Sequence, residues 1–108
     1  MRKLKYSPVY KEKLNNLRIY LDAQFGVKVR KKVLAELDKR VKMLKNYAGM
    51  GISVHDVYGI DCDYFCIYAA KNYVFYRVSE DYIYIVNFYN EREDIMQKMF
   101  GQKSERED

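Results

Sequence analysis

The spacing of apolar residues changes near Tyr47, and this change constrains the fold more than any other feature of the sequence. Before Tyr47, apolar residues recur every three or four positions, as on one face of a helix. After it, they form short runs rich in aromatic and β-branched residues, which is typical of strands. A chain of 108 residues with one proline and five glycines is most simply one compact domain. The sequence therefore predicts a single α+β domain over residues 1–101, followed by a polar tail at 102–108.

The first half of the sequence predicts a short strand and two helices. Leu4-Lys5-Tyr6 has the composition of a strand. Ser7-Pro8 fits the cap and the first position of a helix, and Gly26 can adopt the left-handed conformation that ends one. The apolar stripes are Tyr10, Leu14, Leu17, Leu21 and Phe25 in the first helix, and Val33, Leu37, Val41 and Leu44, widened by Leu34, in the second. With so short a link, the helices should pack as an antiparallel hairpin.

The second half predicts an antiparallel meander of strands. The strand-like runs are Tyr64–Tyr68, Tyr73–Val78 and Tyr82–Tyr89, with Val57–Ile60 as a further candidate and residues 48–56 as a loop. The segments between the three runs are short enough for hairpins. Because both helices and sheet need an apolar face covered, we expect the helical hairpin to pack on one face of a twisted antiparallel sheet. This sheet would have four or five strands and include the N-terminal strand.

Residues 90–101 predict a turn followed by a short last helix. Asn90 is a favourable helix N-cap, and Glu93 lies three residues later, the spacing of a capping box. The apolar face of this helix would consist of Ile95, Met96, Met99 and Phe100. We therefore expect Asn90 to have a structural role.

Charge is distributed unevenly along the chain, although the net charge is only +5. Residues 1–25 contain six basic and two acidic residues, residues 26–47 eight and two, and residues 48–108 six and eleven. This asymmetry predicts that an acidic or polyanionic partner meets the helical first half; the alternative is a solvated lysine-rich surface without a partner. The candidate contacts with a target or partner are Lys28, Lys31, Lys32 and Lys39, together with Lys71 and Tyr73 in the meander.

The sequence indicates neither a membrane segment nor a disulfide or metal site. No apolar run approaches the roughly 18–20 residues that span a bilayer, and the first ten residues lack an apolar stretch of signal-peptide length. On one regular strand, Cys62 and Cys66 would lie roughly 13 Å apart, whereas a disulfide needs Cα atoms within about 7 Å. A pair of cysteines with one distant histidine is also a poor zinc site. We expect a cytoplasmic protein with buried thiols, no metal and no cofactor.

The order of these elements, together with certain residues, resembles the RelE/ParE superfamily of bacterial toxins from type II toxin–antitoxin systems of the plasmid-stabilisation type. LKYSPVYKEKL, residues 4–14, is similar to the opening of these toxins, where a strand ending in Ser-Pro leads into the first helix. NYVFYRVSEDYIYIVNFYNEREDIMQKMFG, residues 72–101, is similar to their closing stretch, with an Arg-x-Asp step at Arg92-Glu93-Asp94. The resemblance covers residues 3–101 and implies a small toxin held inactive by a cognate antitoxin. An acidic, partly disordered antitoxin segment would suit the basic helical hairpin.

The resemblance leaves the activity open, because gyrase-poisoning toxins and ribosome-dependent RNA-cutting toxins share this fold. Metal-free RNA cleavage needs groups that activate the 2′-hydroxyl, balance the phosphate charge and protonate the leaving oxygen. Positions where RNA-cutting relatives carry basic or histidine residues correspond here to Val74, Asn90 and the strand YFCIY, residues 64–68. These replacements favour a toxin that acts by binding a gyrase-type target. The resemblance separately implies either a homodimer or a toxin–antitoxin hetero-oligomer.

Two alternatives remain: an RNA-cutting toxin with an unusual active site, and a degenerate binding module without toxicity. The candidate catalytic residues for RNA cutting are Tyr89, Arg92, Arg77 and Lys71. Arg92 suits phosphate binding or an ion pair with Glu93 or Asp94, and Tyr89, like Tyr73, could stack on a base. His55, the only histidine, lies beside Asp56 in the predicted loop, which makes it a weak catalytic candidate.

Overall fold

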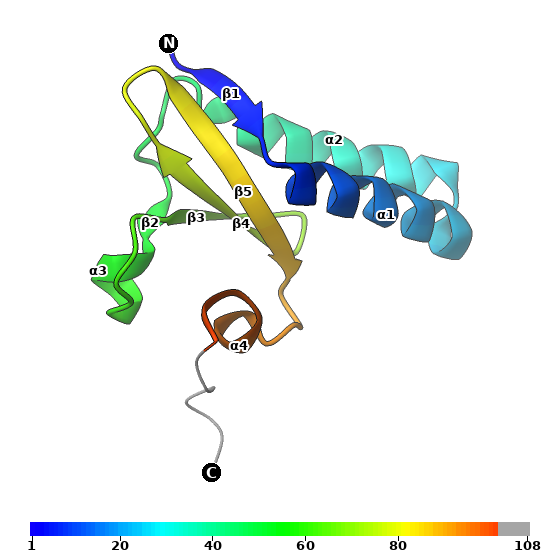
Figure 1. Ribbon diagram of the computed structural model, residues 1–108. Coiled ribbons are helices and arrows are strands. Elements are labelled where there is room, and N and C mark those ends of the chain that lie inside the picture. Colours follow the sequence, from blue (N-terminus) through cyan, green and yellow to red (C-terminus); the bar gives the residue numbers. More distant parts are fainter. Residues whose placement is uncertain (102–108) are drawn as a thin grey trace.

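The computed structural model describes residues 1–101, in which a helical hairpin lies on one face of a five-stranded sheet of order β1-β5-β4-β3-β2 (Figure 1). In chain order the elements are β1 (Lys3–Tyr6), α1 (Pro8–Phe25), α2 (Val27–Met43), β2 (Ile52–Ser53), α3 (Val54–Tyr58), β3 (Phe65–Ala69), β4 (Asn72–Val78), β5 (Tyr82–Asn90) and α4 (Ile95–Phe100). In Figure 1, α1 and α2 lie side by side and extend together beyond the sheet. No helix among these residues is long and apolar enough to cross a membrane. The tail predicted at 102–108 lies outside the described residues.

The ends of α1 follow the predicted sequence signals. The Ser7 hydroxyl oxygen accepts the backbone N–H of Tyr10 at 2.9 Å, so it caps α1, and Pro8 occupies the first helical position. Gly26 joins α1 directly to α2 with φ of +89° and ψ of 170°, outside the left-handed helical region but open to glycine. Arg30 pairs with Asp22 across this link at 2.9 Å. The predicted antiparallel hairpin is confirmed.

The sheet is mixed, whereas the sequence predicted a wholly antiparallel one. The meander β3-β4-β5 is antiparallel as predicted, but β1 pairs with β5 in parallel, from Lys3 opposite Tyr82 to Tyr6 opposite Ile85. The α1–α2 hairpin carries the chain to the far edge of the sheet, and the meander then returns strand by strand toward β1. No local turn links β1 to β5, so no turn signal in the sequence specified their relative direction.

The structure of residues 48–60 differs from the prediction. The predicted strand Val57–Ile60 does not form, and part of the predicted loop is instead β2, which pairs with β3, followed by the one-turn helix α3. The Ser53 hydroxyl accepts the N–H of Asp56 at 3.2 Å and caps α3, and Gly59 ends it with φ of +71°. These two residues stop the chain from remaining extended here.

A hydrophobic core fills the space between the helices and the sheet. Its buried members include Tyr10, Leu37, Val41 and Leu44 from the helical side, and Val74, Tyr76, Ile83, Ile85 and Phe88 from the sheet. Burying an aliphatic or aromatic side chain of this size contributes roughly 1.5–3 kcal/mol. Phe25, predicted as part of the buried stripe, is instead 58% exposed because α1 ends beyond the sheet.

Tyr76 ties the loop before β2 to this core. Its side chain is fully buried, and its hydroxyl donates to the carbonyl oxygen of Ala48 at 2.9 Å and accepts the N–H of Gly51 at 3.1 Å. A Cβ atom on Gly51 would lie 2.5 Å from the Tyr76 hydroxyl and 2.7 Å from the carbonyl oxygen of Cys66. Only glycine fits this close approach between the loop, Tyr76 and β3.

Candidate functional site

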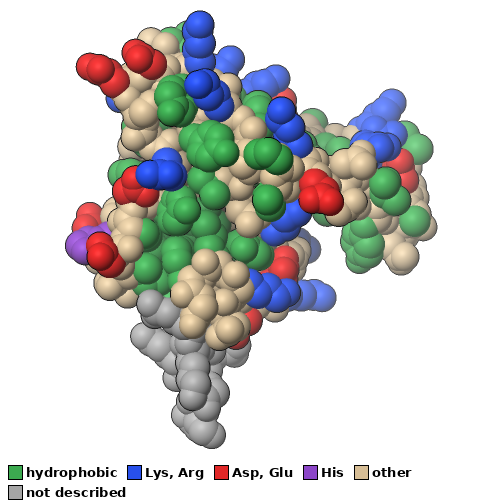
Figure 2. Space-filling model, in the orientation of Figure 1, with side chains coloured by type: hydrophobic (Ala, Val, Ile, Leu, Met, Phe, Trp, Pro, Cys, Tyr) green, Lys and Arg blue, Asp and Glu red, His purple; other side chains and the backbone are tan. Residues whose placement is uncertain are grey.

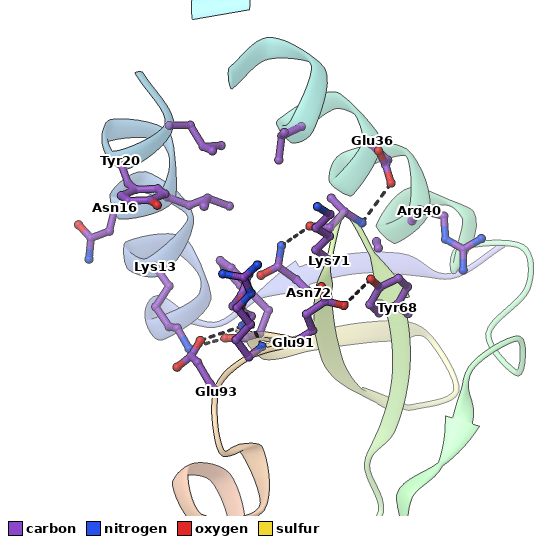
Figure 3. Close-up of a pocket in the computed structure, with 18 of the residues that line it drawn as sticks. Lys13, Asn16, Tyr20, Glu36, Arg40, Tyr68, Lys71, Asn72, Glu91 and Glu93 are labelled. Atoms are coloured by element: carbon purple, nitrogen blue, oxygen red, sulfur yellow. Dashed lines mark hydrogen bonds between the residues drawn. The ribbon is translucent and has the colours of Figure 1, made fainter. Parts of the chain in front are cut away.

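A large open groove lies where the helical hairpin extends past the turn end of the sheet. We call it the hairpin groove, and its volume is about 1220 Å³. It is lined by Lys13, Asn16, Leu17, Tyr20, Leu21 and Phe25 of α1, Val29, Val33, Glu36 and Arg40 of α2, residues 68–72 of the β3–β4 hairpin, and Phe88, Asn90, Glu91, Arg92 and Glu93. In Figure 3, Lys13 and Tyr20 come from α1, Glu36 and Arg40 from α2, and Lys71 lies between the two helices.

The floor of the hairpin groove is apolar and its rim carries both signs of charge. Leu17, Leu21 and Val33 come from the helices and Phe88 from β5. At the outer end, Tyr20 and Phe25 are 55% and 58% exposed, and their rings meet edge to face with centroids 6.3 Å apart. An apolar groove with a polar rim is suited to an amphipathic helix, which places its apolar face in the groove.

The β3–β4 turn holds Lys71 at the mouth of the hairpin groove. Ala70 and Lys71 both have positive φ, 52° and 63°, as in the two-residue turns that match the twist of a hairpin. The Ala70 N–H donates to the Glu36 carboxylate at 3.1 Å, and the Lys71 carbonyl oxygen accepts the N–H of Glu91 at 2.9 Å. Asn72 donates from its side chain to the carbonyl oxygen of Ala70 at 2.7 Å. Contacts with α2 and with the residue after β5 therefore fix the position of this turn.

Lys13 lines the inner part of the hairpin groove, and the sequence analysis did not single it out. Its ammonium group donates to the Asn87 side-chain oxygen at 2.8 Å and to the carbonyl oxygen of Phe88, and it lies 3.8 Å from the centroid of the Tyr89 ring. Burial lowers the pKa of Lys13, which is only half-exposed. The available sequence signal was its helical spacing, three residues after Tyr10 and four before Leu17, which places Lys13 beside the apolar stripe of α1. These contacts attach α1 to the end of β5.

The turn after β5 forms the capping interactions predicted for Asn90, but it is not the start of the last helix. The Asn90 N–H donates to the Glu93 carboxylate at 2.8 Å, and the Asn90 side chain accepts the N–H of Arg92 at 3.0 Å. The N-cap of α4 is Asp94, whose carboxylate accepts the N–H of Gln97 at 3.3 Å. The prediction that Asn90 is the N-cap of the last helix was wrong. Asn90 and Asp94 are both favourable cap residues, and Asn90 is the last residue of β5.

Arg92 does not form either of the two predicted ion pairs among residues 1–101. Glu93 instead pairs with Lys98 at 2.9 Å, and Asp94 caps α4. Burial acts to raise the pKa of Glu93, but the hydrogen bonds from Lys98 and from the Asn90 N–H outweigh it, so the pKa is lowered. The exposed Arg92 side chain lines the hairpin groove.

The four candidate residues for RNA cutting do not converge on one site. Lys71 and Arg92 line the hairpin groove. Arg77 points from the other face of the sheet and pairs with Asp63 at 2.9 Å. Tyr89 is 9% exposed and packs edge to face on Phe75. Val74, where relatives carry arginine, is 0% exposed in the core beneath the helices.

The face of the sheet opposite the helical hairpin carries a second hydrophobic cluster. Cys66, Phe75 and Tyr89 are its buried strand members, and Ile95, Met96, Met99 and Phe100 of α4 pack against them, as predicted for the last helix. In Figure 2, hydrophobic side chains cover the middle of the face that bears α4, and Lys and Arg lie mainly around its margins. Burial raises the pKa of the Cys66 thiol to about 12. Both cysteines are free, and Cys62 is half-buried just before β3.

The remaining predicted contact residues lie outside the hairpin groove. Lys28, Lys31, Lys32 and Lys39 are exposed on α2. Tyr73 is half-buried against Tyr68, with ring centroids 5.1 Å apart. His55 lies in α3 rather than in a loop, with its Nδ1 atom 3.4 Å from the Asp56 carboxylate. Among residues 1–101, no three His, Cys, Asp or Glu side chains are grouped so that they could hold a metal ion.

An open sheet with a helical hairpin on one face and a short last helix is the RelE/ParE-like architecture expected from the sequence. The family model described as the ParE toxin of the type II toxin–antitoxin system parDE matches residues 4–95. The chain therefore belongs to the ParE toxin family. A solved structure described as the chromosomal ParDE TA system from P. aeruginosa has a similar fold, with a TM-score of 0.68 and 16% identity over 83% of this chain and 96% of that chain. No curated protein matches the sequence.

Proposed function

We propose that this chain is a toxin that acts by binding a gyrase-type target, and that a cognate antitoxin neutralises it by occupying the hairpin groove. Membership of the ParE toxin family supports the toxin role and an antitoxin partner. We further propose that residues 1–101 act as one unit in the cytoplasm. The choice of target rests on the side chains of the sheet.

The observation that carries the choice of target is the chemistry of the sheet face opposite the helices. This face presents a packed apolar cluster closed by α4, and its one arginine among the candidates, Arg77, is already paired with Asp63. RNA cutting needs a proton acceptor and cations that converge on one phosphate. Lys71 and Arg92 lie in the hairpin groove instead, whereas Arg77 is paired with Asp63 and Tyr89 is buried in the second hydrophobic cluster. A toxin that works by binding needs no such convergence.

A paired assay tests the target. Purified protein should inhibit supercoiling by gyrase, and expression of the toxin should produce no new ends in translated mRNA, as measured by primer extension. In-frame mRNA cuts within minutes of induction, with supercoiling unaffected at saturating protein, would contradict the proposal. Failure to slow growth at all would indicate a degenerate binding module.

A substitution at Tyr89 further distinguishes a toxin that acts by binding from one that cuts RNA. Tyr89→Phe keeps the ring that packs on Phe75 and removes only the hydroxyl, which accepts the Asn87 side-chain N–H at 3.1 Å. If the toxin acts by binding, this variant should remain toxic. An RNA-cutting toxin that uses the Tyr89 hydroxyl should lose most of its toxicity.

The antitoxin proposal follows from the apolar floor and charged rim of the hairpin groove. A partly disordered segment that folds into an amphipathic helix could place apolar residues over Leu17 and Phe25, and acidic residues near Lys71 and Arg92. Co-expression of the antitoxin should restore growth. Hydrogen exchange of the complex should show new protection in α1 and α2; protection confined to α3 would contradict this location.

A further inference from the structure

The outer side of α2 carries four exposed lysines that neither the core nor the hairpin groove uses. We call the set Lys28, Lys31, Lys32 and Lys39 the lysine face. At about 3.6 residues per turn, these side chains project roughly opposite the buried Leu37. Val33, four residues before Leu37 and on nearly the same side of the helix, lines the hairpin groove. The lysine face therefore points away from both the core and the groove, and Figure 2 shows basic side chains gathered at the outer end of the helical hairpin.

The charges of the lysine face are not neutralised within the described residues. The ion pairs of α2 are Arg30 with Asp22 and Lys42 with Asp38, and none of the ion pairs among residues 1–101 includes a lysine of this face. Lys28 lies one helical turn from Lys31 and from Lys32, and like charges at these spacings destabilise a helix by about 0.2–0.5 kcal/mol per pair. A bound polyanion would relieve this repulsion.

The composition of the lysine face indicates which polyanion fits. Lysine ammonium groups are compact point charges that bind phosphate without selecting the orientation of a base. The exposed residue between these lysines on the same side is Ala35, so the face offers no aromatic ring to stack on an unpaired base. It also offers no apolar centre of the kind that a protein interface buries. These features favour the phosphate backbone of a duplex as the partner, rather than single-stranded nucleic acid or an acidic protein.

The length of the lysine face also suits a duplex. Lys28 and Lys39 are eleven residues apart, which is about 16 Å along a helix that rises 1.5 Å per residue. Double-stranded DNA presents one charge per about 1.7 Å of its axis, so roughly ten phosphates fall within this length. We propose that the lysine face binds the phosphate backbone of double-stranded DNA without regard to sequence. This binding depends neither on the proposed target nor on the antitoxin.

The test measures how strongly the full-length purified protein binds a fluorescent DNA duplex of arbitrary sequence as salt is varied. Four phosphate contacts predict a slope of log K against log salt of about −3.6, and so about a 150-fold loss of affinity between about 50 and 200 mM salt. Lys28→Gln/Lys32→Gln should make this slope shallower by about 1.8. Lys28→Arg/Lys32→Arg keeps both charges and should restore the original slope.

A matched control removes the same charge from another surface. Lys3 and Lys5 are exposed on β1, and their neighbour Leu4 packs against the core beneath the helices, so both lysines project from the opposite face of the sheet. Lys3→Gln/Lys5→Gln should leave the slope nearly unchanged. Any of four results would overturn the proposal: no binding to duplex at low salt, equal effects of the two Gln variants, tighter binding to single-stranded DNA, or an effect of Lys28→Gln/Lys32→Gln on antitoxin binding but not on DNA binding.

Discussion

Phe25, the last residue of α1, provides the most direct test of the hairpin groove as a binding site. Its side chain lines the groove yet is 58% exposed in the free protein. Because it contributes little to the core, Phe25→Ala should lower the free energy of unfolding by less than about 1 kcal/mol. The same substitution should weaken binding of the antitoxin much more, since a partner in the groove would cover the exposed ring.

The expected loss of affinity follows from the exposed area. A phenylalanine side chain presents roughly 200 Å², so an exposed fraction of 58% leaves roughly 115 Å² for a partner to cover. At about 25 cal/mol per Å², full coverage contributes about 3 kcal/mol, which corresponds to about 100-fold in affinity. Because coverage is seldom complete, we expect Phe25→Ala to weaken antitoxin binding by about 10- to 100-fold.

Tyr58→Ala is the matched control, because Tyr58 is 56% exposed but lies at the end of α3, outside the groove. Calorimetric titration of each purified variant with the antitoxin measures affinity, and urea unfolding measures stability. Equal losses of affinity for the two variants would show that general surface hydrophobicity, rather than the groove, drives binding. Unchanged affinity for Phe25→Ala would refute the groove as the antitoxin site.

Three further predictions concern stability. Gly51→Ala should destabilise the protein by about 2–4 kcal/mol in urea unfolding, because the new Cβ atom would disrupt both hydrogen bonds of the buried Tyr76 hydroxyl. The control is Gly49→Ala, which has nothing within 4 Å of its Cβ position and should change stability by less than about 0.5 kcal/mol. Burial raises the pKa of Tyr10, so its contribution to stability is fully present below the unfolded pKa of about 10 and is lost as the pH rises above it. Stability measured by unfolding should therefore fall above about pH 10, and less steeply in Tyr10→Phe; an equally steep fall would count against burial of this phenol. Asp94→Ala should weaken α4 by about 1 kcal/mol, seen as faster amide exchange in residues 97–100, whereas Asn90→Ala should leave that exchange nearly unchanged.

The elements with local signals were predictable from the sequence. Ser7-Pro8 and Gly26 mark the ends of α1 through side-chain capping and backbone freedom, which depend only on neighbouring residues. The strands β3, β4 and β5 carry enough aromatic and β-branched residues to identify them within one or two positions. The α3 segment was missed because a five-residue helix is too short to show a period.

The hairpin groove could be predicted only in part, because its residues come from segments far apart in the sequence. Lys71 was a candidate contact, and the structure places it on the groove. Lys13 was not, since its hydrogen bond to Asn87 links residues 74 positions apart. Arg92 has no ion pair with Glu93 because Glu93 pairs with Lys98 instead. The sequence places both cations near Glu93, and composition does not decide which of them pairs with it.

The pairing of β1 with β5 has a consequence for synthesis on the ribosome. Lys3 pairs with Tyr82, so β1, the first strand made, has no partner strand until β5 has been made. Until then, the nascent helices lack β5, the strand on which α1 packs, and part of their apolar surface stays uncovered. A newborn chain of this fold therefore completes its sheet only after residues 82–90 have been made.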